Sequence, residues 1–384
     1  MSQTVVGDDP YLHQYFSRFQ VTRSVGDSPR RVVFILGSTN VGGGTYVVLE
    51  HAQWLLDQGW DVIVAAMYHD AGTRWHPALD RVEVVSLEEA ERAEFDVAIA
   101  TWWPTAYELP RVRARHYVYL VQSVEARFYG EEEQGKWATA LAELTYTFGL
   151  TVITIAEWIQ LYLAMRHRVP ALLVRNGIRK DVYNPMGPAV SARQSGRLRV
   201  LVEGPVDVPM KRVASAIALA RAGGADEVWL MTGAPPGDGA GADRVFERVS
   251  VESTPTLYRS CDVLVKLSQV EGMYGPPLEM FHCGGTVVTY DVTGHEEYVD
   301  HGKNGLVVPM NDEQGVVDAI RSLKRDPALL SRLRGGALAT AATWPDWLES
   351  SSHFGRLIAS IAALPGPDNC SMLLAIRGAQ RDFP

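Results

Sequence analysis

Two doubly wound α/β domains are the fold class that the sequence predicts, and three observations indicate it. The chain has 384 residues, which is enough for two domains of ordinary size. Short apolar runs alternate with helical stretches in two successive series, as in parallel sheets with helices on both faces. Between the series, residues 184–197 are rich in Pro, Gly and Ser, which is typical of a linker.

The first series begins with a strand, a Gly-rich loop, a helix and a second strand over residues 30–67, and Gly59 ends the helix. Further strands are expected at 81–87, 95–103, 116–123, 150–156 and 171–178. The second series predicts strands at 198–205, 227–233, 261–268, 285–292 and 305–310. Its helices are expected at 211–223, after Pro276, and at 313–326 and 344–364.

Four segments follow from this pattern. An N-terminal extension over residues 1–29 precedes a first Rossmann-like domain over 30–190. A second Rossmann-like domain occupies 191–345, and a helix and tail occupy 346–384. Ligands of such sheets bind at the carboxyl ends of the strands, so two facing sheets would form a cleft with one ligand on each wall.

Composition excludes several classes of protein. The chain is 47% hydrophobic and has a net charge of −9, which disfavours disorder and a nucleic-acid binder. Its three cysteines form no CxxC pair, so neither a disulfide framework nor a zinc site is expected. The opening residues lack the pattern of a signal peptide, and no apolar run reaches about 18 residues. We expect a cytoplasmic protein, with attachment to the inner membrane face left open.

Candidate ligand contacts in the first domain follow its strands. Gly43 and Gly44 belong to "GSTNVGGGTYV", a loop that lets the backbone approach an anion at a helix start. The loop lacks the third glycine of the dinucleotide fingerprint and the Lys-Ser/Thr of a Walker loop, and a tight turn fits it equally. Aromatic side chains that could stack on sugar rings, or pack in the core, are Trp102, Trp103, Tyr107, Phe128 and Tyr129.

The second domain presents charged residues at two helix starts. Lys211 and Arg212 oppose the helix dipole, which a bound diphosphate would explain, although a solvated basic pair is the alternative. In "VEGMYGPPLE" the prolines suit the first helical position and place Glu279 in the first turn. A carboxylate there suits a ribose diol or is a plain helix-start acid. We find no D-x-D pair or metal-ligand spacing, which is compatible with a metal-free diphosphate site.

Residues 258–320 resemble glycosyltransferase family 4, whose members are retaining enzymes of the GT-B fold. The matching segments are Glu271 and Glu279 in an E-x7-E arrangement, then 285–288, Glu297 and Asn304-Gly305. Weaker similarity extends over roughly residues 31–363. The stretches "TWWPTAYEL" and "QSVEARFY" look most like the rhamnosyltransferase branch associated with rhamnan synthesis.

The resemblance implies an acceptor-binding first domain, a nucleotide-sugar-binding second domain and a C-terminal helix that packs back toward the first domain. It implies retaining transfer of a hexosyl or deoxyhexosyl group from a nucleoside-diphosphate sugar to a hydroxyl of a natural product or cell-surface glycan, including a lipid-linked one. Neither a metal nor another cofactor is implied, and the protein would be a monomer or homodimer with no nucleic-acid partner.

The resemblance also assigns roles to residues. Glu271 and Lys211 are the candidate catalytic residues, with Lys211 neutralising the leaving diphosphate and Glu271 meeting the donor sugar. Glu279 would bind the ribose hydroxyls, and the backbone N–H groups of 272–275 would face the donor. The candidate substrate-binding residues are Gly43, Gly44, Arg212, Gly272, Met273, Tyr274, Gly275, Glu279, Trp102, Trp103, Gln122 and Glu125.

This chain departs from the family pattern at several places, including the absence of a His near Gln122 and Gly275 in place of a Leu. Pro205 follows Gly204 where the family has Arg, and Arg212 is a candidate replacement. Tyr274 stands where the family has a glycine, which would reshape the pocket of the donor sugar. Two other functions fit the same architecture, namely a nucleotide-sugar epimerase and a non-catalytic nucleotide-sugar-binding subunit.

Overall fold

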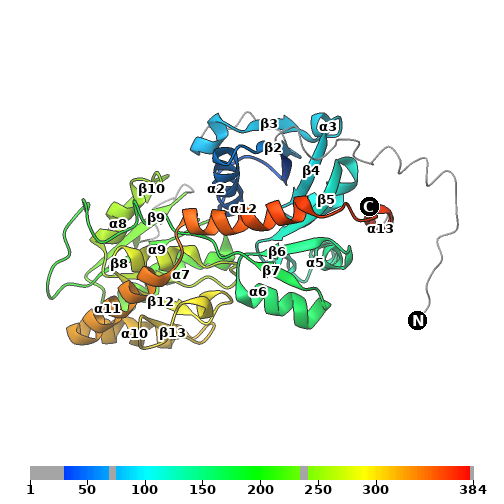
Figure 1. The fold of residues 1–384 in the computed structure, drawn as a ribbon. Helices are drawn as coiled ribbons and strands as arrows, with labels where there is room; N and C mark the ends of the chain where they lie inside the picture. Colours follow the sequence, from blue (N-terminus) through cyan, green and yellow to red (C-terminus); the bar gives the residue numbers. More distant parts are fainter. Residues whose placement is uncertain (1–29, 69–74, 234–240, 381–384) are drawn as a thin grey trace, which may run out of the picture. The chain divides into compact units, whose positions relative to one another are not determined.

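The computed structural model describes residues 30–68, 75–233 and 241–380, which form two units built on separate parallel sheets (Figure 1). The first unit extends through Asn176 and resumes at Trp347, and the second unit covers residues 177–346. In both units helices connect parallel strands, so the predicted fold class is confirmed. The predicted N-terminal extension lies outside the described residues.

Among the described residues, the first unit has a seven-stranded sheet in the order β3-β2-β1-β4-β5-β6-β7. Its strands are β1 (Arg31–Leu36), β2 (Asp61–Ala66), β3 (Glu83–Ser86), β4 (Glu94–Ala100), β5 (Arg113–Val121), β6 (Thr151–Thr154) and β7 (Ala171–Leu173). Its α-helices are α2 (Gly43–Asp57), α3 (Leu87–Ala90), α4 (Trp103–Glu108), α5 (Glu133–Leu144), α6 (Glu157–Tyr162), α12 (Trp347–Ala363) and α13 (Cys370–Gln380). Single turns include η2 (Leu109–Arg111), η3 (Glu125–Phe128) and the π turn η5 (Leu163–His167).

Helix α12 belongs to the first unit, although it follows the second unit in the chain (Figure 1). It packs on α2, β4 and β5, with the ring of Phe354 stacked 4.2 Å from that of His51. A Cβ at Gly355 would lie 2.0 Å from the Trp54 ring, so only glycine allows this close approach. The predicted return of the C-terminal helix to the first domain is therefore confirmed.

The second unit has a six-stranded sheet within its described residues, in the order β10-β9-β8-β11-β12-β13. Its strands are β8 (Arg199–Glu203), β9 (Glu227–Thr232), β10 (Arg244–Glu247), β11 (Val263–Lys266), β12 (Thr286–Tyr290) and β13 (Gly305–Val308). Its α-helices are α7 (Val213–Ala222), α8 (Thr254–Ser260), α9 (Gly275–His282), α10 (Glu313–Arg325) and α11 (Pro327–Thr343). The short turn η6 (Pro209–Lys211) precedes α7.

Alternating side chains of the central strands fill two cores, one on each face of this sheet. Leu201 and Leu264 contribute to the core under α8, α9 and α11. Val202, Val265 and their neighbours contribute to the core under α7 and α10. Because both faces are covered, the middle residues of the central strands are apolar, which is the pattern that made these strands predictable.

The first domain boundary differs from its predicted position at residue 190. Residues 177–190 belong to the second unit because Tyr183 packs in its core against Tyr258. The Arg259 side chain also donates hydrogen bonds to the backbone carbonyls of Val182, Asn184 and Pro188. The composition of the linker did not reveal these contacts.

Candidate functional site

Charged side chains meet at the carboxyl edge of the second sheet. Strands β8 and β11 are parallel neighbours, and their register sets Val202 beside Val265. Glu203 and Lys266, the last residues of these strands, therefore lie side by side, and Lys266 Nζ is 2.5 Å from Glu203 Oε2. In open parallel sheets this edge is where ligands bind.

The two candidate catalytic residues form an ion pair at the same edge. Lys211 Nζ lies 2.8 Å from Glu271 Oε1, and the two side chains are 23% and 12% exposed. The loops that carry them are also joined by the backbone, because the Gln269 N–H donates to the Met210 carbonyl at 2.9 Å. The sequence predicted both residues, and the structure brings their side chains together.

Glu279, on α9, interacts with Glu203 and Lys266 of the same edge. The helix begins at Gly275 with prolines at its next positions, as predicted, but Glu279 then falls beyond the first turn. The predicted dipole contact is therefore wrong. Glu279 Oε2 instead accepts a hydrogen bond from the Tyr258 hydroxyl at 3.0 Å. Burial raises the pKa of the Glu279 carboxyl to about 7, against the lowering effect of the Tyr258 hydroxyl.

Tyr274 does not present its side chain to a ligand. Its ring is fully buried, and its hydroxyl lies 2.8 Å from both the Lys266 carbonyl, to which it donates, and Thr289 Oγ1. Its own carbonyl accepts a hydrogen bond from Tyr298. The prediction that this side chain shapes the donor pocket is wrong, because the ring anchors the loop to β11 and β12.

The other predicted residues of the loop, Gly272, Met273 and Gly275, differ in whether they can contact a ligand. The N–H of Gly275 donates to the Met273 carbonyl at 3.1 Å, so this amide is already used within the loop. The Met273 side chain is partly buried against the core. Gly272 is half-buried beside Glu271 and remains a candidate for close approach of a donor.

Arg212, which was predicted to bind the donor diphosphate, is paired with a residue of another helix. It has a left-handed backbone with φ of 52° at the start of α7. Its guanidinium donates to Glu313 Oε1 of α10 at 2.6 Å. Since Glu313 already neutralises this cation, Arg212 is a poor replacement for the arginine that is missing after Gly204.

In the first unit, the carboxyl ends of β1, β4 and β5 bring several predicted residues together. A Cβ at Gly44, in the first turn of α2, would lie 3.3 Å from Gln122 Nε2, which follows β5. A Cβ at Gly37 would lie 3.0 Å from the Trp102 ring, which follows β4. Gly43 has no atom within 4 Å of such a position, so the backbone there is open to a ligand.

Trp103 and Glu125 lie in the core, so their side chains do not form a contact surface. Glu125 is 5% exposed, and its Oε2 accepts hydrogen bonds from the Trp103 backbone N–H at 2.8 Å and the Tyr119 hydroxyl at 3.4 Å. The Trp103 indole donates to the Tyr129 hydroxyl at 2.6 Å. Their predicted role in binding substrate is corrected to one in packing. Burial raises the pKa of the Glu125 carboxyl to about 8.

Replacing Glu125 by Gln is expected to stabilise the protein at alkaline pH. The native pKa of about 8 exceeds the ordinary glutamate pKa of 4.5, so folding stability falls as pH rises between these values. Above pH 8 the neutral amide removes a penalty on the order of a few kcal/mol. Melting temperatures from pH 5 to 9 should show a gain that grows with pH, whereas the exposed control Glu88→Gln should show none. A gain independent of pH would contradict this account.

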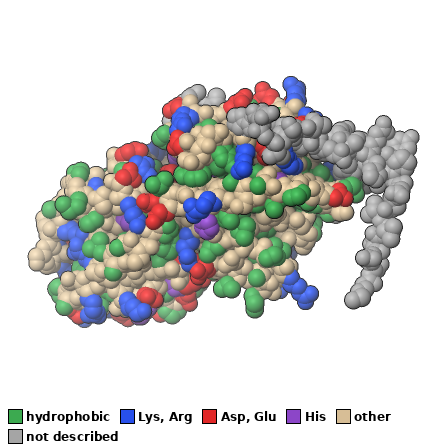
Figure 2. Space-filling view, viewed as in Figure 1, with side chains coloured by type: hydrophobic (Ala, Val, Ile, Leu, Met, Phe, Trp, Pro, Cys, Tyr) green, Lys and Arg blue, Asp and Glu red, His purple; other side chains and the backbone are tan. Residues whose placement is uncertain are grey.

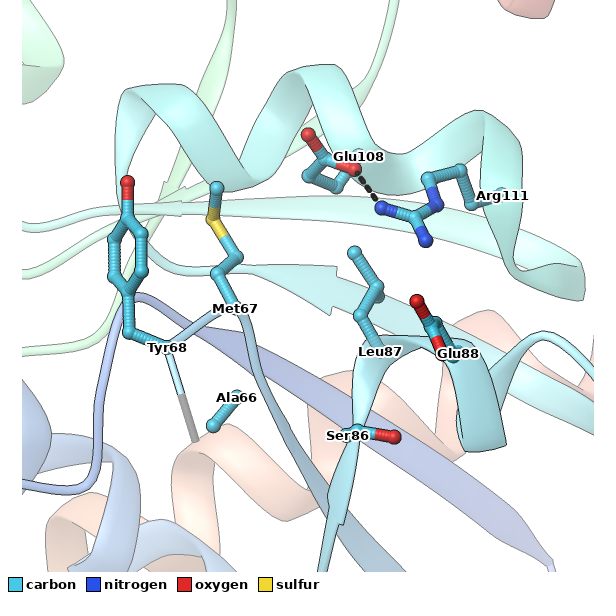
Figure 3. Close-up of a pocket in the computed structure, with 8 residues that line it drawn as sticks. All are labelled: Ala66, Met67, Tyr68, Ser86, Leu87, Glu88, Glu108 and Arg111. Carbon is cyan, nitrogen blue, oxygen red and sulfur yellow. Dashed lines mark hydrogen bonds and ion pairs between the residues drawn. The ribbon is translucent and has the colours of Figure 1, made fainter. Parts of the chain in front are cut away.

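A hollow of about 200 Å³ opens in the first unit beside the carboxyl ends of β2 and β3 (Figure 3). Arg111 lies at its wall and donates to Glu108 at 2.9 Å, and it also pairs with Glu91. The lining residues are Ala66, Met67, Tyr68, Ser86, Leu87, Glu88, Glu108 and Arg111. None of the predicted site residues lines this hollow.

The described residues show neither a metal-binding cluster nor a membrane-spanning helix. They contain no group of three or more His, Cys, Asp or Glu side chains placed to hold a metal ion. No helix among them combines the length and apolar character needed to cross a membrane.

Lys266, Glu203 and Tyr258 were not predicted from the sequence. Lys266 and Glu203 pair at the carboxyl edge of the second sheet, and the Tyr258 hydroxyl donates to Glu279. A signal for Lys266 was present, because a lysine ends the otherwise apolar strand "VLVK" directly before the predicted donor loop. No such signal marked Tyr258, whose contact with Glu279 depends on how α8 packs against α9.

Known proteins resemble this chain in both sequence and fold. Residues 243–338 match the model of the family "Glycosyl transferases group 1". The O-antigen biosynthesis protein RfbC of Myxococcus xanthus is 30% identical over 250 residues, which are 62% of this chain and 19% of that protein. The chain thus spans about a fifth of the length of this curated relative.

Solved structures match nearly the whole fold. Sucrose-phosphate synthase from Thermosynechococcus elongatus superposes with a TM-score of 0.67 at 17% identity, covering 87% of this chain and 99% of that one. Anabaena HepE in complex with UDP and glucose gives a TM-score of 0.68 at 17% identity, with 86% and 100% covered. The chain therefore has the GT-B fold, and its residues 243–338 match the glycosyl transferases group 1 family.

Proposed function

We propose that this chain is a retaining glycosyltransferase of family 4, which moves a sugar from a nucleoside-diphosphate sugar to an acceptor hydroxyl. One observation carries the proposal. The match to glycosyl transferases group 1 includes Glu271, Glu279 and Lys266; both glutamates interact with Lys266, and Glu271 also pairs with Lys211, which precedes the matched residues. HepE, which shares the fold, binds UDP and UDP-glucose in its solved complexes, and this supports a nucleotide-sugar donor.

In the proposed reaction the diphosphate leaves the sugar and an acceptor hydroxyl attacks from the same face. Lys211 and backbone N–H groups stabilise the negative charge that grows on the leaving diphosphate. Glu279 accepts hydrogen bonds from the ribose hydroxyls, and Glu271 orients the donor sugar. The proton of the acceptor passes to the leaving phosphate, so neither a metal nor a carboxylate nucleophile takes part.

The test uses the full chain with UDP-glucose, GDP-mannose and dTDP-rhamnose, each with and without a panel of alkyl glycosides. A transferase releases nucleoside diphosphate only with an acceptor, and NMR of the product shows the anomeric configuration of the donor. An altered free sugar without acceptor would instead indicate an epimerase, and binding without turnover a non-catalytic subunit. If no nucleotide sugar binds, all three functions are wrong.

The donor is the finer part of the proposal. The stretches around Trp102 and Gln122 resemble the rhamnosyltransferase branch, so we propose a deoxyhexosyl donor and a cell-surface glycan as acceptor. Trp102 lies against Gly37, and Gln122 lies against Gly44 at the carboxyl edge of the first sheet, where an acceptor sugar would bind. Turnover with dTDP-rhamnose above that with the other two donors would support this choice.

A surface of the first unit supports attachment to an anionic membrane, where a lipid-linked acceptor would reside. Leu161 and Met165, on α6 and η5, are 63% and 84% exposed, and Leu172 of the edge strand β7 is 41% exposed. Exposed Arg166 and Arg168 lie beside them. Figure 2 shows hydrophobic and basic side chains together at the surface over α6. Apolar insertion and attraction to anionic lipid act together at such a surface.

Leu161→Glu/Met165→Glu is expected to reduce binding of the chain to vesicles with about 30% phosphatidylglycerol by roughly tenfold or more, since it replaces inserting side chains by anions. Cosedimentation measures this, with Leu348→Glu, 67% exposed on α12, as the matched control. Equal vesicle binding by the wild type and both variants would contradict attachment at this surface. A change of oligomeric state in light scattering would assign the surface to a second copy instead.

A further inference from the structure

Lys266 is a buried cation that the proposed reaction does not yet use. It ends β11, whose other residues are fully apolar, and its side chain is 4% exposed. Its Nζ lies 2.5 Å from Glu203 Oε2 and 3.3 Å from the Glu203 carbonyl. A lysine in this position needs a partner, because burying an unpaired charge is very costly.

Three carboxylates, not one, act on this ammonium group. Burial alone would lower the pKa of Lys266, but Glu203, Glu271 and Glu279 together raise it, so the group stays charged. Glu203 comes from β8, Glu271 from the loop after β11, and Glu279 from α9. The cation therefore lies at the point where these three segments of the second unit meet.

The position of Lys266 also relates to the arginine that is missing after Gly204. A Cβ at Gly204 would lie 3.9 Å from Lys266 Nζ, whereas Arg212 is paired with Glu313. Lys266 is thus a cation beside the place where the resemblance led us to expect one. The backbone of Lys266 adds a second link, since its carbonyl accepts the Tyr274 hydroxyl that anchors the loop after Glu271.

Lys211 cannot neutralise Glu271 and a diphosphate equally well at once. Its Nζ lies 2.8 Å from Glu271 Oε1, so the two charges already neutralise each other. When Lys211 turns toward the leaving group, Glu271 and Glu279 remain as two carboxylates in one partly buried cluster. Like charges so placed repel one another unless a cation stays near them.

We propose that Lys266 is a positioning residue of the donor site, whose fixed ammonium group holds the carboxylates of Glu271 and Glu279 in place when Lys211 binds the diphosphate. This inference rests on the proposed nucleotide-sugar function. The alternative is a purely structural role, in which Lys266 only neutralises Glu203 and the ion pair stabilises the ends of β8 and β11. The two accounts differ in what happens when both members of that pair are made neutral.

The experiment is a double-mutant cycle with Lys266→Met, Glu203→Gln and the double variant. Each folded variant is titrated with whichever of UDP-glucose, GDP-mannose and dTDP-rhamnose the wild type binds most tightly. We expect Lys266→Met to raise Kd roughly tenfold or more and Glu203→Gln to change it little. The double variant should remain as weak as Lys266→Met. Recovery of wild-type Kd in the double variant would overturn the proposal, because Lys266 would then serve Glu203 alone.

The pH dependence of Kd also distinguishes the two roles, because loss of a purely structural Lys266–Glu203 pair would leave this dependence unchanged. The titratable groups that interact with Glu271 or Glu279 are Glu203, Lys211, Lys266, Tyr183, Tyr258, Tyr274, Tyr298 and Cys283. Lys266 lowers the pKa of the Glu279 carboxyl, so without this cation Glu279 ionises at higher pH and the midpoint of donor binding should shift upward. An unshifted midpoint would contradict the proposal. Failure of the wild type to bind any of the three donors would instead remove the proposed function itself.

Discussion

Replacing Glu279 by Gln is expected to weaken nucleotide-sugar binding by roughly ten- to hundredfold, since hydrogen bonds to a charged group contribute about 1.5–3 kcal/mol. The amide keeps the size of the side chain and one acceptor, but it loses the charge that makes the carboxylate a strong partner for two ribose hydroxyls. Calorimetric titration of the full chain measures the change. Glu247→Gln, on an exposed glutamate at the end of β10, is the matched control.

The same carboxyl group gives donor binding a pH dependence with a definite sign. With a pKa of about 7 in the free protein, Glu279 is largely protonated below neutrality and charged above it. If the carboxylate accepts the ribose hydroxyls, affinity rises as pH increases through 7, and this rise is absent in Glu279→Gln. Equal affinities of wild type and Glu279→Gln at pH 8 would show that Glu279 only supports Tyr258 and has no contact with the donor.

Lys211→Met is expected to lower kcat by on the order of 10²- to 10³-fold, which is the usual effect of removing one group that stabilises developing negative charge. The KM for the donor should change much less, because the charge on the diphosphate grows as the sugar–phosphate bond breaks. Initial rates at varied donor concentration separate the two effects. Lys303→Met provides the control, since Lys303 is 76% exposed on the second unit.

Other changes in kcat and KM of Lys211→Met would show that Lys211 has a different role. If Lys211→Met raised KM and left kcat intact, Lys211 would bind donor and transition state equally and would not be catalytic. If neither parameter changed, the ion pair with Glu271 would be its whole role. In the latter case Lys266 would be the next cation of this edge to replace.

Much of the fold could be predicted because buried parallel strands leave a clear pattern. The apolar run of β1 and the near-continuous apolar residues of β11 and β12 were recognised as strands for this reason. Strand β10, "RVFE", was missed because an edge strand flanked by charges lacks that pattern. The domain boundary was misplaced because it depends on the packing of Tyr183, which local composition does not encode.

The site was predictable only where a residue type and a motif agreed. Glu271, Glu279 and Lys211 were found in this way, but the Lys211–Glu271 pair depends on the neighbouring strands β8 and β11, and the Tyr258–Glu279 contact depends on the packing of α8 on α9. The opposite error occurred at Tyr274, where a bulky residue in a glycine position suggested a ligand contact. Its hydroxyl instead satisfies a backbone carbonyl in the core.

The central claim is that a nucleoside diphosphate binds at the carboxyl edge of β8 and β11. Hydrogen–deuterium exchange of the full chain, with and without saturating UDP, GDP or dTDP, tests it most directly. The account predicts slower exchange in residues 203–213 and 266–283 with the nucleotide that binds, and little change in the exposed ends of α10 and α11. Binding with protection confined to other segments, or no protection by any of the three nucleotides, would contradict it.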